Sequence, residues 1–364
     1  MTAVALGIPG IGGSAAAAPA GGPGAPELAQ LRRDSPWLVD TFGRRARDLR
    51  VSLTDRCNLR CTYCMPADGL DWLPGDELLT DDELVRLIDL AVGRLGIEEI
   101  RFTGGEPLLR KGIVELIGRV GRCSPRPEMS LTTNGIVFAR RAADFVAAGL
   151  DRINISLDSL NPDTFQRLTR RPRLPDVLDA LAAAADVGLA PVKINTVLMR
   201  GVNDHETADL LQFSLDRGYQ LRFIEQMPLD AGHSWTRERM VTADEIQQSL
   251  AERFTLTPHP AARLGAPAEL FLVDGGPATV GIIASVTRPF CGDCDRTRLT
   301  ADGQVRTCLF SRNETDLRAM VRGGATDEDI AAAWRVATWG KLPGHAIDDP
   351  SFLQPDRPMS AIGG

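Results

Sequence analysis

The sequence lacks any apolar run long enough to cross a membrane, and it lacks an excess of positive charge. A spanning helix needs about 20 predominantly apolar residues, and the 364 residues contain no such run. The formal net charge is −7, so we expect neither a nucleic-acid binder nor a membrane binder, since such proteins carry basic surfaces. A small anionic ligand remains compatible, because its binding depends on local arginines.

The N-terminal segment lacks the basic residues of a signal peptide. No charged side chain precedes Glu27, whereas a secretory signal begins with a positively charged region followed by an uninterrupted apolar stretch. Gly, Ala and Pro dominate here and interrupt the apolar stretch. We therefore expect residues 1–40 to form a disordered leader of a cytoplasmic protein.

The sequence also lacks the cysteine pattern of a disulfide framework. There are seven cysteines, an odd number, and six of them fall in two tight clusters. In a cytosolic chain such clusters more often bind metal than form disulfides. Thiolates favour zinc and iron–sulfur clusters. Cys123 stands alone, and we expect it to be a buried thiol without a functional role.

From Arg47 onward, short apolar runs alternate with amphipathic helical stretches. The predicted strands are residues 49–54, 98–104, 128–134, 152–158, 191–198 and 221–227. One helix between them begins after Thr80, with Glu83 completing a capping box. Repeated βα units predict a parallel sheet. Polar residues stand at the strand ends, where parallel α/β barrels gather functional groups: Thr103, Thr132, Asn134, Ser156, Asp158, Asn195 and Glu225.

The pattern changes in the last third of the chain. A helix over residues 242–254 is followed by a proline-containing linker and then by a hairpin over residues 269–285, with a turn at residues 274–276. We predict a βα domain over residues 41–258 and a smaller C-terminal domain over residues 259–364.

The first cysteine cluster has the spacing C-x3-C-x2-C and follows the first predicted strand. Three thiolates, from Cys57, Cys61 and Cys64, can hold three irons of a [4Fe–4S] cluster and leave the fourth iron open to a substrate. A zinc site or a reactive thiol loop is the alternative, although structural zinc prefers a fourth protein ligand and no histidine lies nearby in sequence.

The second cluster has the spacing C-x2-C-x13-C and consists of Cys291, Cys294 and Cys308. A zinc knuckle is again the alternative. The intervening "DRTRL" places Arg296 and Arg298 on one face if it is extended. Two guanidinium groups on one face suit phosphate or purine acceptors.

These segments carry a resemblance. The cysteine pattern "CNLRCTYC", with Tyr63 before the third cysteine, and "RFTGGEP" at residues 101–107 resemble the radical S-adenosylmethionine superfamily. "LTTNG", "INISLDSL", "KINTVLMRGVND", "LRFIEQM", "FCGDCDRTRLTADGQVRTCLF" and the terminal "IGG" are similar to the GTP 3′,8-cyclase family of lyases, which performs the first step of molybdenum cofactor biosynthesis. The resemblance runs from about Asp48 to Gly364.

The resemblance implies an incomplete (βα)6 TIM-like barrel whose mouth is closed by the smaller α+β domain, with one [4Fe–4S] cluster at each end of the cavity. The first cluster would bind S-adenosylmethionine, and the second would bind the guanine of GTP. The family's S-adenosylmethionine contacts correspond to Tyr63, Gly105, Ser156 and Met227. Its GTP contacts correspond to Arg50, Arg101, Thr132, Lys193, Arg296, Thr297 and Arg298. The resemblance also implies that Gly363 and Gly364 reach into the active site.

The family's reaction begins with reductive cleavage of S-adenosylmethionine, after which a 5′-deoxyadenosyl radical removes hydrogen from C3′ of GTP and the C3′ radical attacks C8. As partners, the resemblance implies an external electron donor, a homodimer, and the next enzyme, cyclic pyranopterin monophosphate synthase, as an acceptor of the product. Glu99 departs from the basic residue expected in some relatives. Two alternatives stay open: a radical enzyme that modifies a peptide, and a zinc-stapled scaffold without catalysis.

Overall fold

The computed structural model describes residues 35–350 and 352–363. Six parallel strands follow one another in chain order: β1 (Asp48–Ser52), β2 (Glu99–Thr103), β3 (Glu128–Thr133), β4 (Arg152–Ser156), β5 (Lys193–Val197) and β6 (Gln220–Ile224). Each pairs in parallel with the next. The six predicted strands are confirmed, and each ends before its predicted end, so several of the polar residues placed at strand ends lie in the loops that follow.

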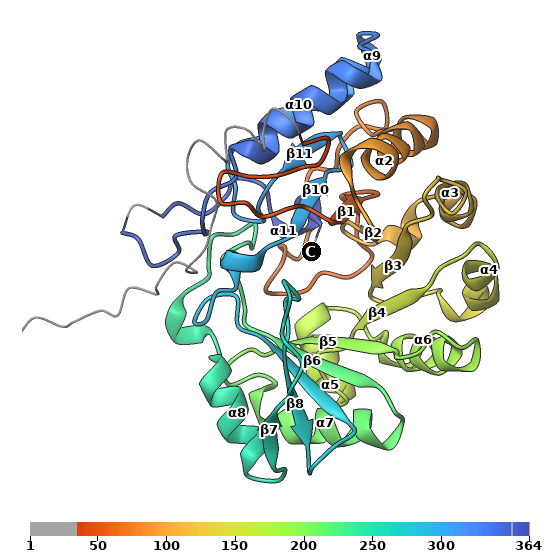
Figure 1. Ribbon diagram of the computed structural model, residues 1–364. Helices are drawn as coiled ribbons and strands as arrows, with labels where there is room; N and C mark the ends of the chain where they lie inside the picture. The colour runs from red at the N-terminus through yellow and green to blue at the C-terminus, as the bar shows by residue number, and fades with distance from the viewer. Residues whose placement is uncertain (1–34, 351, 364) are drawn as a thin grey trace, which may run out of the picture.

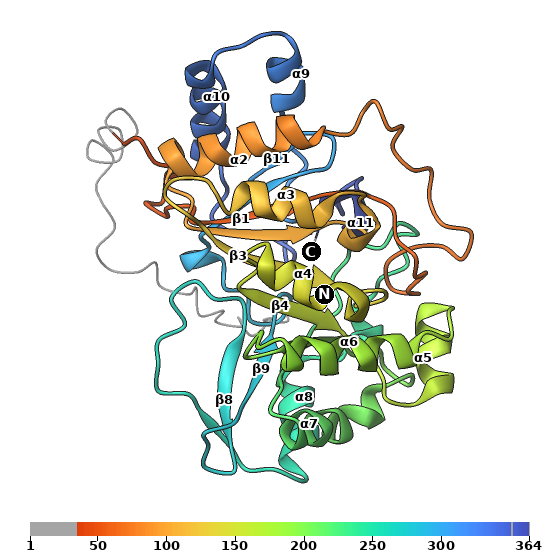
Figure 2. The same ribbon diagram turned by 90° about the vertical axis from the view of Figure 1, so that its right-hand side faces the viewer.

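Helices cover the outer face of these strands (Figures 1 and 2). They are α2 (Asp81–Leu95), α3 (Ile113–Val120), α4 (Ala142–Ala147), α6 (Leu174–Asp186) and α7 (Thr207–Asp216). The short helix α5 (Pro162–Thr169) follows β4 and packs against α6. The predicted capping box of α2 is present: the Glu83 N–H donates to the Thr80 hydroxyl at 3.2 Å, and the Thr80 N–H donates to the Glu83 carboxylate at 2.8 Å. The helices shield the sheet, so β1 is buried along its whole length.

The C-terminal part of the chain extends the sheet at both ends. Its strands are β7 (Leu256–Pro258), β8 (Glu269–Val273), β9 (Thr279–Ile283), β10 (Arg296–Leu299), β11 (Gln304–Arg306) and β12 (Thr315–Asp316). β9 pairs in parallel with β6, and β10 pairs in parallel with β1. The strand order is therefore β12-β11-β10-β1-β2-β3-β4-β5-β6-β9-β8-β7.

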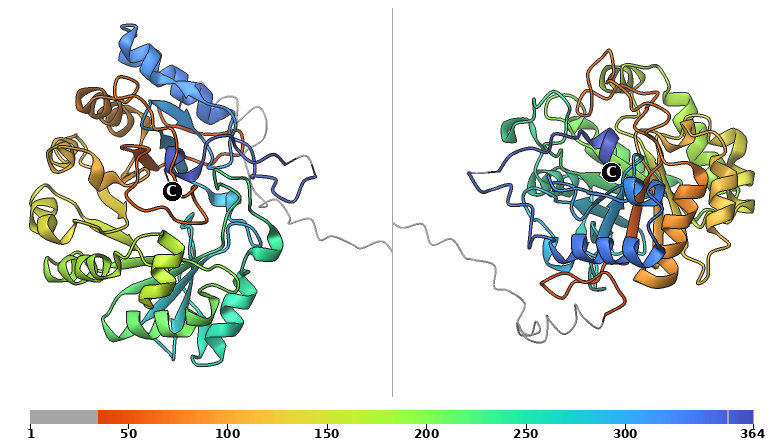
Figure 3. Two further views of the ribbon diagram at one scale, coloured as in Figure 1. Left: turned by 180° about the vertical axis from the view of Figure 1, so that it is seen from behind. Right: turned by 90° about the horizontal axis from the view of Figure 1, so that it is seen from above.

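This order is that of an incomplete TIM-like barrel, as predicted, because the two end strands of the described sheet do not pair with each other. The remaining helices are α8 (Ala243–Ala251), α9 (Leu317–Arg322), α10 (Asp327–Trp339) and α11 (Met359–Ile362). Figures 1 and 3 place α10 on the side of β10 and the β7–β8 hairpin on the opposite side. Residues 259–364 thus add strands to both edges of the barrel sheet.

Most of the predicted leader lies outside the described residues, which begin at Ser35. Its last residues pack against α2: Leu38 is fully buried and its N–H donates to the carbonyl of Leu95 at 3.1 Å. Within the described ranges, no helix combines the length and the apolar character that a membrane span requires.

Candidate functional site

A cavity of about 320 Å³ lies among the inward-facing residues of the parallel strands and the two cysteine loops. Its volume is in the range of small-molecule sites. Both predicted cysteine clusters line it: Cys57, Cys61, Cys64, Cys291, Cys294 and Cys308. Other predicted site residues line it as well: Arg50, Tyr63, Arg101, Gly105, Thr132, Ser156, Met227, Arg296 and Arg298. Residues far apart in the sequence therefore meet in one cavity.

The first cysteine loop, which carries Cys57, Cys61 and Cys64, follows β1 and rests on α5. The N–H of Thr62 donates to the carbonyl of Leu168 at 2.9 Å. Burial raises the pKa of Cys57 to about 11 and that of Cys64 to about 12, because a buried thiolate loses its hydration. These thiols gain thiolate character only beside a bound cation, so the loop fits a metal centre better than a free nucleophile.

Two glycines seat this loop. A Cβ on Gly104 would lie 2.3 Å from the carbonyl oxygen of Thr54, and a Cβ on Gly105 would lie 2.3 Å from that of Asp55. The N–H of Gly105 donates to the Thr54 carbonyl at 2.8 Å. Glycines without a Cβ also let the backbone approach a ligand closely. Both do line the cavity, but their missing side chains also make room for the backbone that leads into the cysteines.

Glu106, the acidic residue of the "GGE" segment, ties β2 to β3. Its carboxylate accepts hydrogen bonds from the Thr133 hydroxyl at 2.6 Å and the Asn134 N–H at 2.7 Å. Burial raises the pKa of Glu106 to about 7, although these donors favour the charged form. The side chain of Asn134 in turn donates to Asn58 in the cysteine loop at 2.6 Å. The loop is thereby connected to two neighbouring strands.

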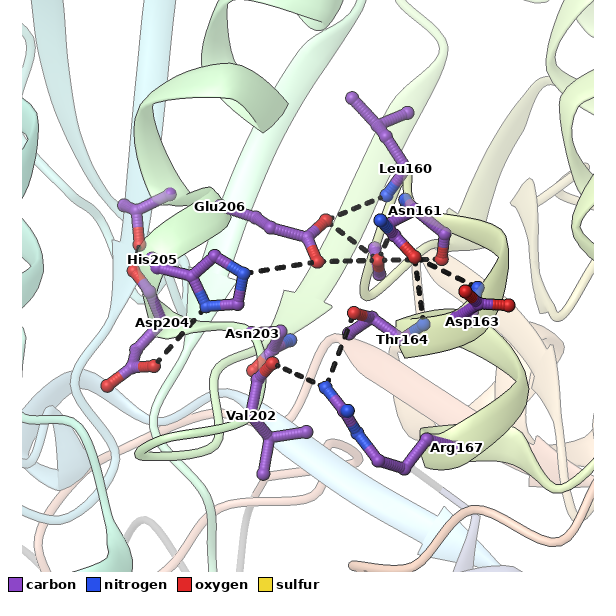
Figure 4. A network of polar contacts seen from close by, with 12 residues as sticks. Leu160, Asn161, Asp163, Thr164, Arg167, Val202, Asn203, Asp204, His205 and Glu206 are labelled. Carbon is purple, nitrogen blue, oxygen red and sulfur yellow. Dashed lines mark hydrogen bonds and ion pairs between the residues drawn. The ribbon is translucent and has the colours of Figure 1, made fainter.

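Tyr63 is oriented by Asp158, which lies just after β4. The Tyr63 hydroxyl donates to the Asp158 carboxylate at 2.7 Å, and the Asn203 side chain donates to the Asp158 carbonyl at 2.7 Å. Figure 4 shows the polar network around Asn203, in which Glu206 accepts a hydrogen bond from the N–H of Leu160 at 3.1 Å. Burial raises the pKa of Asp158 to about 6. The aromatic ring is thus held at the cavity wall by buried polar contacts.

The second cysteine loop lies at the amino end of β10. Cys291 and Cys294 precede this strand, and Cys308 follows β11. Burial raises the pKa of Cys291. Burial acts in the same direction on Cys294, but the charges of Arg296 and Lys341 outweigh it and lower the pKa of Cys294 to about 6. The two triplets therefore differ in their electrostatic surroundings.

The spacing of the thiols bears on which metal centre they fit. Among the described residues, no three Cys, His, Asp or Glu side chains are close enough to hold one metal ion together. Zinc binds its sulfur ligands at about 2.3 Å, which draws them close to one another. In an iron–sulfur cluster each cysteine binds a different iron, so the sulfurs stand farther apart. Three thiolates are also the donor set that holds three irons of a [4Fe–4S] cluster and leaves the fourth open.

Arginines converge on the cavity. Asp48 is a carboxylate among them: its oxygen lies 3.7 Å from Nε of Arg50 and 3.9 Å from a guanidinium nitrogen of Arg101. The buried Nε atoms of Arg50, Arg101 and Arg222 have no hydrogen-bond partner. Burial, with repulsion from Arg101, lowers the pKa of Arg222 to about 9. A bound polyanion would accept hydrogen bonds from these unpartnered donors and offset the positive charge of the crowded guanidinium groups.

Two predicted GTP contacts do not line the cavity. The Thr297 hydroxyl accepts a hydrogen bond from the indole N–H of Trp334 at 3.4 Å, so the alternation of β10 that turns the flanking arginines inward turns Thr297 toward α10. A contact from Thr297 to a ligand would use its backbone. Lys193 lies two residues before Asn195, which does line the cavity. Burial, with repulsion from Arg222, lowers the pKa of Lys193 to about 8.

The C-terminal tail enters the curve of the sheet, where Figure 1 places the end of the chain. The carbonyl of Gly363 accepts a hydrogen bond from Arg298. A Cβ on Gly363 would lie 2.4 Å from the Ser52 hydroxyl. Gly364 is outside the described residues. Gly363 thus contacts an arginine of the cavity wall, while the prediction that the tail reaches into the active site stays a prediction.

The sequence analysis did not identify Arg222 as a site residue, and it placed Glu225 among the polar residues at strand ends where functional groups gather. Arg222 lies in the middle of β6 and faces the cavity; strand alternation within "LRFIEQM" could have identified it. Glu225 does not line the cavity. It accepts hydrogen bonds from the N–H groups of Ala243 and Val286, both at 2.8 Å, and so joins α8 to the loop after β9. Its role is structural.

Comparison with known proteins adds sequence relatives. Residues 51–214 match the Radical SAM superfamily, and residues 219–347 match the family described as Molybdenum Cofactor Synthesis C. The chain is 66% identical over 334 residues to GTP 3′,8-cyclase of Streptomyces coelicolor, covering 92% of this chain and 98% of the relative. It is 58% identical to the enzyme of that name from Mycolicibacterium smegmatis, with both chains fully covered. It is 61% identical to GTP 3′,8-cyclase 2 of Mycobacterium tuberculosis, covering 90% and 92%.

Solved structures with the same fold are more distant. Streptococcus suis SuiB bound to S-adenosylmethionine has a TM-score of 0.54 and 12% identity, over 79% of this chain and 66% of SuiB. SuiB bound to the precursor peptide SuiA has a TM-score of 0.55 and 13% identity, over 79% and 65%. At this identity the likeness concerns the fold.

Proposed function

The chain belongs to the GTP 3′,8-cyclase family of radical S-adenosylmethionine enzymes, and on that basis we propose that it converts GTP to (8S)-3′,8-cyclo-7,8-dihydroguanosine 5′-triphosphate. This reaction is the first step of molybdenum cofactor biosynthesis. The observation that carries the proposal is the composition of the cavity wall, in which two cysteine triplets and several arginines line one cavity.

Membership of the superfamily implies S-adenosylmethionine and an iron–sulfur cluster as cofactors. We propose two [4Fe–4S] clusters, the first on Cys57, Cys61 and Cys64 and the second on Cys291, Cys294 and Cys308. Tyr63, Gly105, Ser156 and Met227 would contact S-adenosylmethionine, since they lie near the first triplet in sequence or line the same cavity. When bound, the first cluster and S-adenosylmethionine supply the electron and the carbon radical that removes hydrogen from C3′ of GTP.

The protein's own residues bind, orient and enclose the substrate. A triphosphate carries up to about four negative charges, and it would neutralise the crowded guanidinium groups, whose charge-assisted hydrogen bonds are geometrically specific. The proposed GTP contacts are Arg50, Arg101, Thr132, Lys193, Arg296, Thr297 and Arg298, to which the geometry adds Arg222. Fixing both ends of the nucleotide would hold C3′ and C8 at reacting distance, and the tail around Gly363 would exclude water.

Neither alternative from the sequence has comparable support. A peptide-modifying enzyme shares the fold, as SuiB does, but the unpartnered guanidinium nitrogens favour a polyanion. A zinc scaffold would need ligands within reach of one ion, and the described residues contain no such group.

We further propose a cytoplasmic location, an external electron donor, a homodimer, and product transfer to cyclic pyranopterin monophosphate synthase. The location is supported by the seven cysteines, none of which forms a disulfide, as is usual in a reducing compartment.

An anaerobic turnover assay tests the function. Reconstituted protein is mixed with S-adenosylmethionine, GTP and a strong reductant, and the products are identified by mass spectrometry. We expect 5′-deoxyadenosine together with a cyclised isomer of GTP. The Cys57→Ser variant should release neither product, whereas Cys123→Ser, which changes the cysteine outside both triplets, should match the parent.

The outcomes separate the parts of the proposal. Release of 5′-deoxyadenosine by Cys57→Ser would contradict the first cluster assignment. Release of 5′-deoxyadenosine by the parent with unchanged GTP would leave the radical chemistry intact and refute the substrate. Absence of both products from protein with verified iron and sulfide would refute the catalytic function.

A further inference from the structure

Lys341 makes an unusual set of contacts with the second cysteine loop. It follows α10 and is 5% exposed. Its ammonium nitrogen lies 2.9 Å from the carbonyl oxygen of Cys294, 3.3 Å from the Cys294 sulfur and 2.9 Å from the carbonyl oxygen of Arg296. An ammonium group has three N–H donors, so this geometry provides an acceptor for each of them.

The residue type fits this geometry. Lys341 is one of three lysines in a sequence with 41 lysines and arginines, so arginine is the ordinary cation of this chain. A planar guanidinium directs its donors into a fixed fork, whereas an ammonium on a flexible stem can direct three donors from one point. The three acceptors here surround one nitrogen, which explains why arginine would not substitute.

The lysine is held in place from both sides. In α10 before it, Trp334 is fully buried and donates to Thr297. After it, Arg44 donates to the carbonyl of Leu342 at 2.6 Å and also to the carbonyl of Cys291 at 2.6 Å. The backbone on both sides of Lys341 is therefore fixed, and this holds the ammonium group against the cysteine loop.

Lys341 acts from behind the cavity wall. Cys294, Arg296 and Cys308 line the cavity, but Lys341 does not. Within the described residues, the hydrogen bonds of its ammonium group all go to the segment from Cys294 to Arg296. A ligand in the cavity would meet the cysteine side of this loop, and the lysine would reach the ligand only through the metal centre.

We propose that Lys341 raises the reduction potential of the second cluster through a charge-assisted N–H···S hydrogen bond to the sulfur of Cys294. The proposal rests on the second cluster of the proposed function. Reduction adds one electron to the cluster and so increases the negative charge on its sulfur ligands. A cation that donates to one of these sulfurs stabilises the reduced state more than the oxidised state, and hydrogen bonds to ligand sulfurs are an established determinant of such potentials.

The test isolates the second cluster in the full-length chain. The triple variant Cys57→Ser, Cys61→Ser and Cys64→Ser should load iron on the second triplet alone. Its midpoint potential is measured by redox titration followed by electron paramagnetic resonance, with and without Lys341→Met. Losing the donor should shift the one-electron equilibrium toward the oxidised form at least tenfold, which corresponds to about 59 mV to more negative potential.

Graded variants separate charge from structure. Lys341→Gln keeps a donor without the charge and should give a shift close to that of Lys341→Met. Lys341→Arg keeps the charge with a different geometry and should give a smaller shift. Lys111→Met, which changes an exposed lysine, should leave the potential unchanged.

Three results would overturn the proposal, each for a different reason. If the Lys341→Met variant carries a full complement of iron on the second triplet and its midpoint potential is unchanged, Lys341 does not affect that potential. Loss of the cluster from all three Lys341 variants would mean that the lysine builds the loop and does not tune it. Failure of the triple-serine parent to load iron would refute the second cluster itself, and with it the proposed function's two-cluster arrangement.

Discussion

The cations of the cavity oppose one another. Arg50 and Arg101 share Asp48 at 3.7 Å and 3.9 Å, distances too long for a hydrogen bond. Burial and repulsion from Arg101 lower the pKa of Arg222, and burial and repulsion from Arg222 lower the pKa of Lys193. Such an arrangement destabilises the empty site, and part of the binding energy of an anion would relieve this repulsion.

Because Lys193 can lose its charge near neutral pH, the affinity for GTP should depend on pH. Its pKa of about 8 means that the amine loses its proton as the pH rises through about 8, before Arg222, whose pKa is lowered to about 9. GTP affinity should therefore weaken about tenfold, or about 1.4 kcal/mol, between about pH 7 and about pH 9. Calorimetry on the loaded protein without S-adenosylmethionine measures the effect. Lys193→Met should bind more weakly at pH 7 and lose most of this pH dependence; an unchanged slope would assign the titration to another group.

Arg298 is expected to act on GTP and not on S-adenosylmethionine. It lines the cavity near the second triplet and contacts the tail. Arg298→Ala should lower kcat/KM for GTP at least a hundredfold, because a charge-assisted contact is lost in a buried site. It should still release 5′-deoxyadenosine. The two products are quantified in one assay, and an equal loss of both would point to a damaged first cluster.

Some of these residues could be predicted and others could not. Arg296 and Arg298 followed from the alternation of a strand next to cysteines, and both line the cavity. Thr297 is turned outward by the same alternation. Lys341 could not be predicted, because its contact with Cys294 depends on the path of the chain through α10, and no local pattern records this path.

At the scale of elements, the C-terminal tail is fastened before it enters the sheet. Arg357 donates to both carboxylate oxygens of Asp302, at 3.0 Å and 2.7 Å, a paired geometry that gives directional hold. The short helix α11 follows, with Ile362 fully buried. Gly363 then sits at φ 82° between β1 and the end of β2, where only glycine fits without strain.

A side chain at Gly363 should therefore expel the tail. Valine would place Cβ 2.4 Å from the Ser52 hydroxyl and 2.8 Å from a methyl group of Thr103. Gly363→Val should release the last residues to carboxypeptidase and reduce GTP turnover at least tenfold. Gly75→Val, at a position where a Cβ meets nothing within 4 Å, is the matched control. Equal protection of both C-termini would contradict the seating of the tail.

At the scale of the whole molecule, the barrel sheet depends on the C-terminal segment. β1 and β6 would both be edge strands without β10 and β9. Unpaired edges with buried apolar side chains promote aggregation. The sequence suggests a domain boundary at residue 258, but strands from both sides of this residue belong to one sheet.

Truncation tests this dependence. Residues 35–258 should be insoluble or aggregated on size-exclusion chromatography, whereas residues 35–364 should behave as the full chain does. A monomeric, cooperatively unfolding 35–258 fragment would instead show that the six parallel strands are sufficient alone.

The sequence predicted the individual helices and strands, but it did not predict which strands extend the sheet at its two edges. The six βα units, the α2 cap and the hairpin of β8 and β9 follow local patterns, and all are present. The attachment of β9 to β6 and of β10 to β1 joins residues distant in sequence, so no window of periodicity could reveal it.

The pairing of β1 with β10 also dictates an order of events during synthesis. Asp48 aligns with Arg296, so the first strand leaves the ribosome long before its second neighbour is translated. Chains fold from the N-terminus as they emerge, yet one edge of this sheet must wait for nearly the whole polypeptide. The second cysteine loop and the tail arrive last. The cavity that both cysteine loops line can therefore be completed only after nearly the whole chain has been translated.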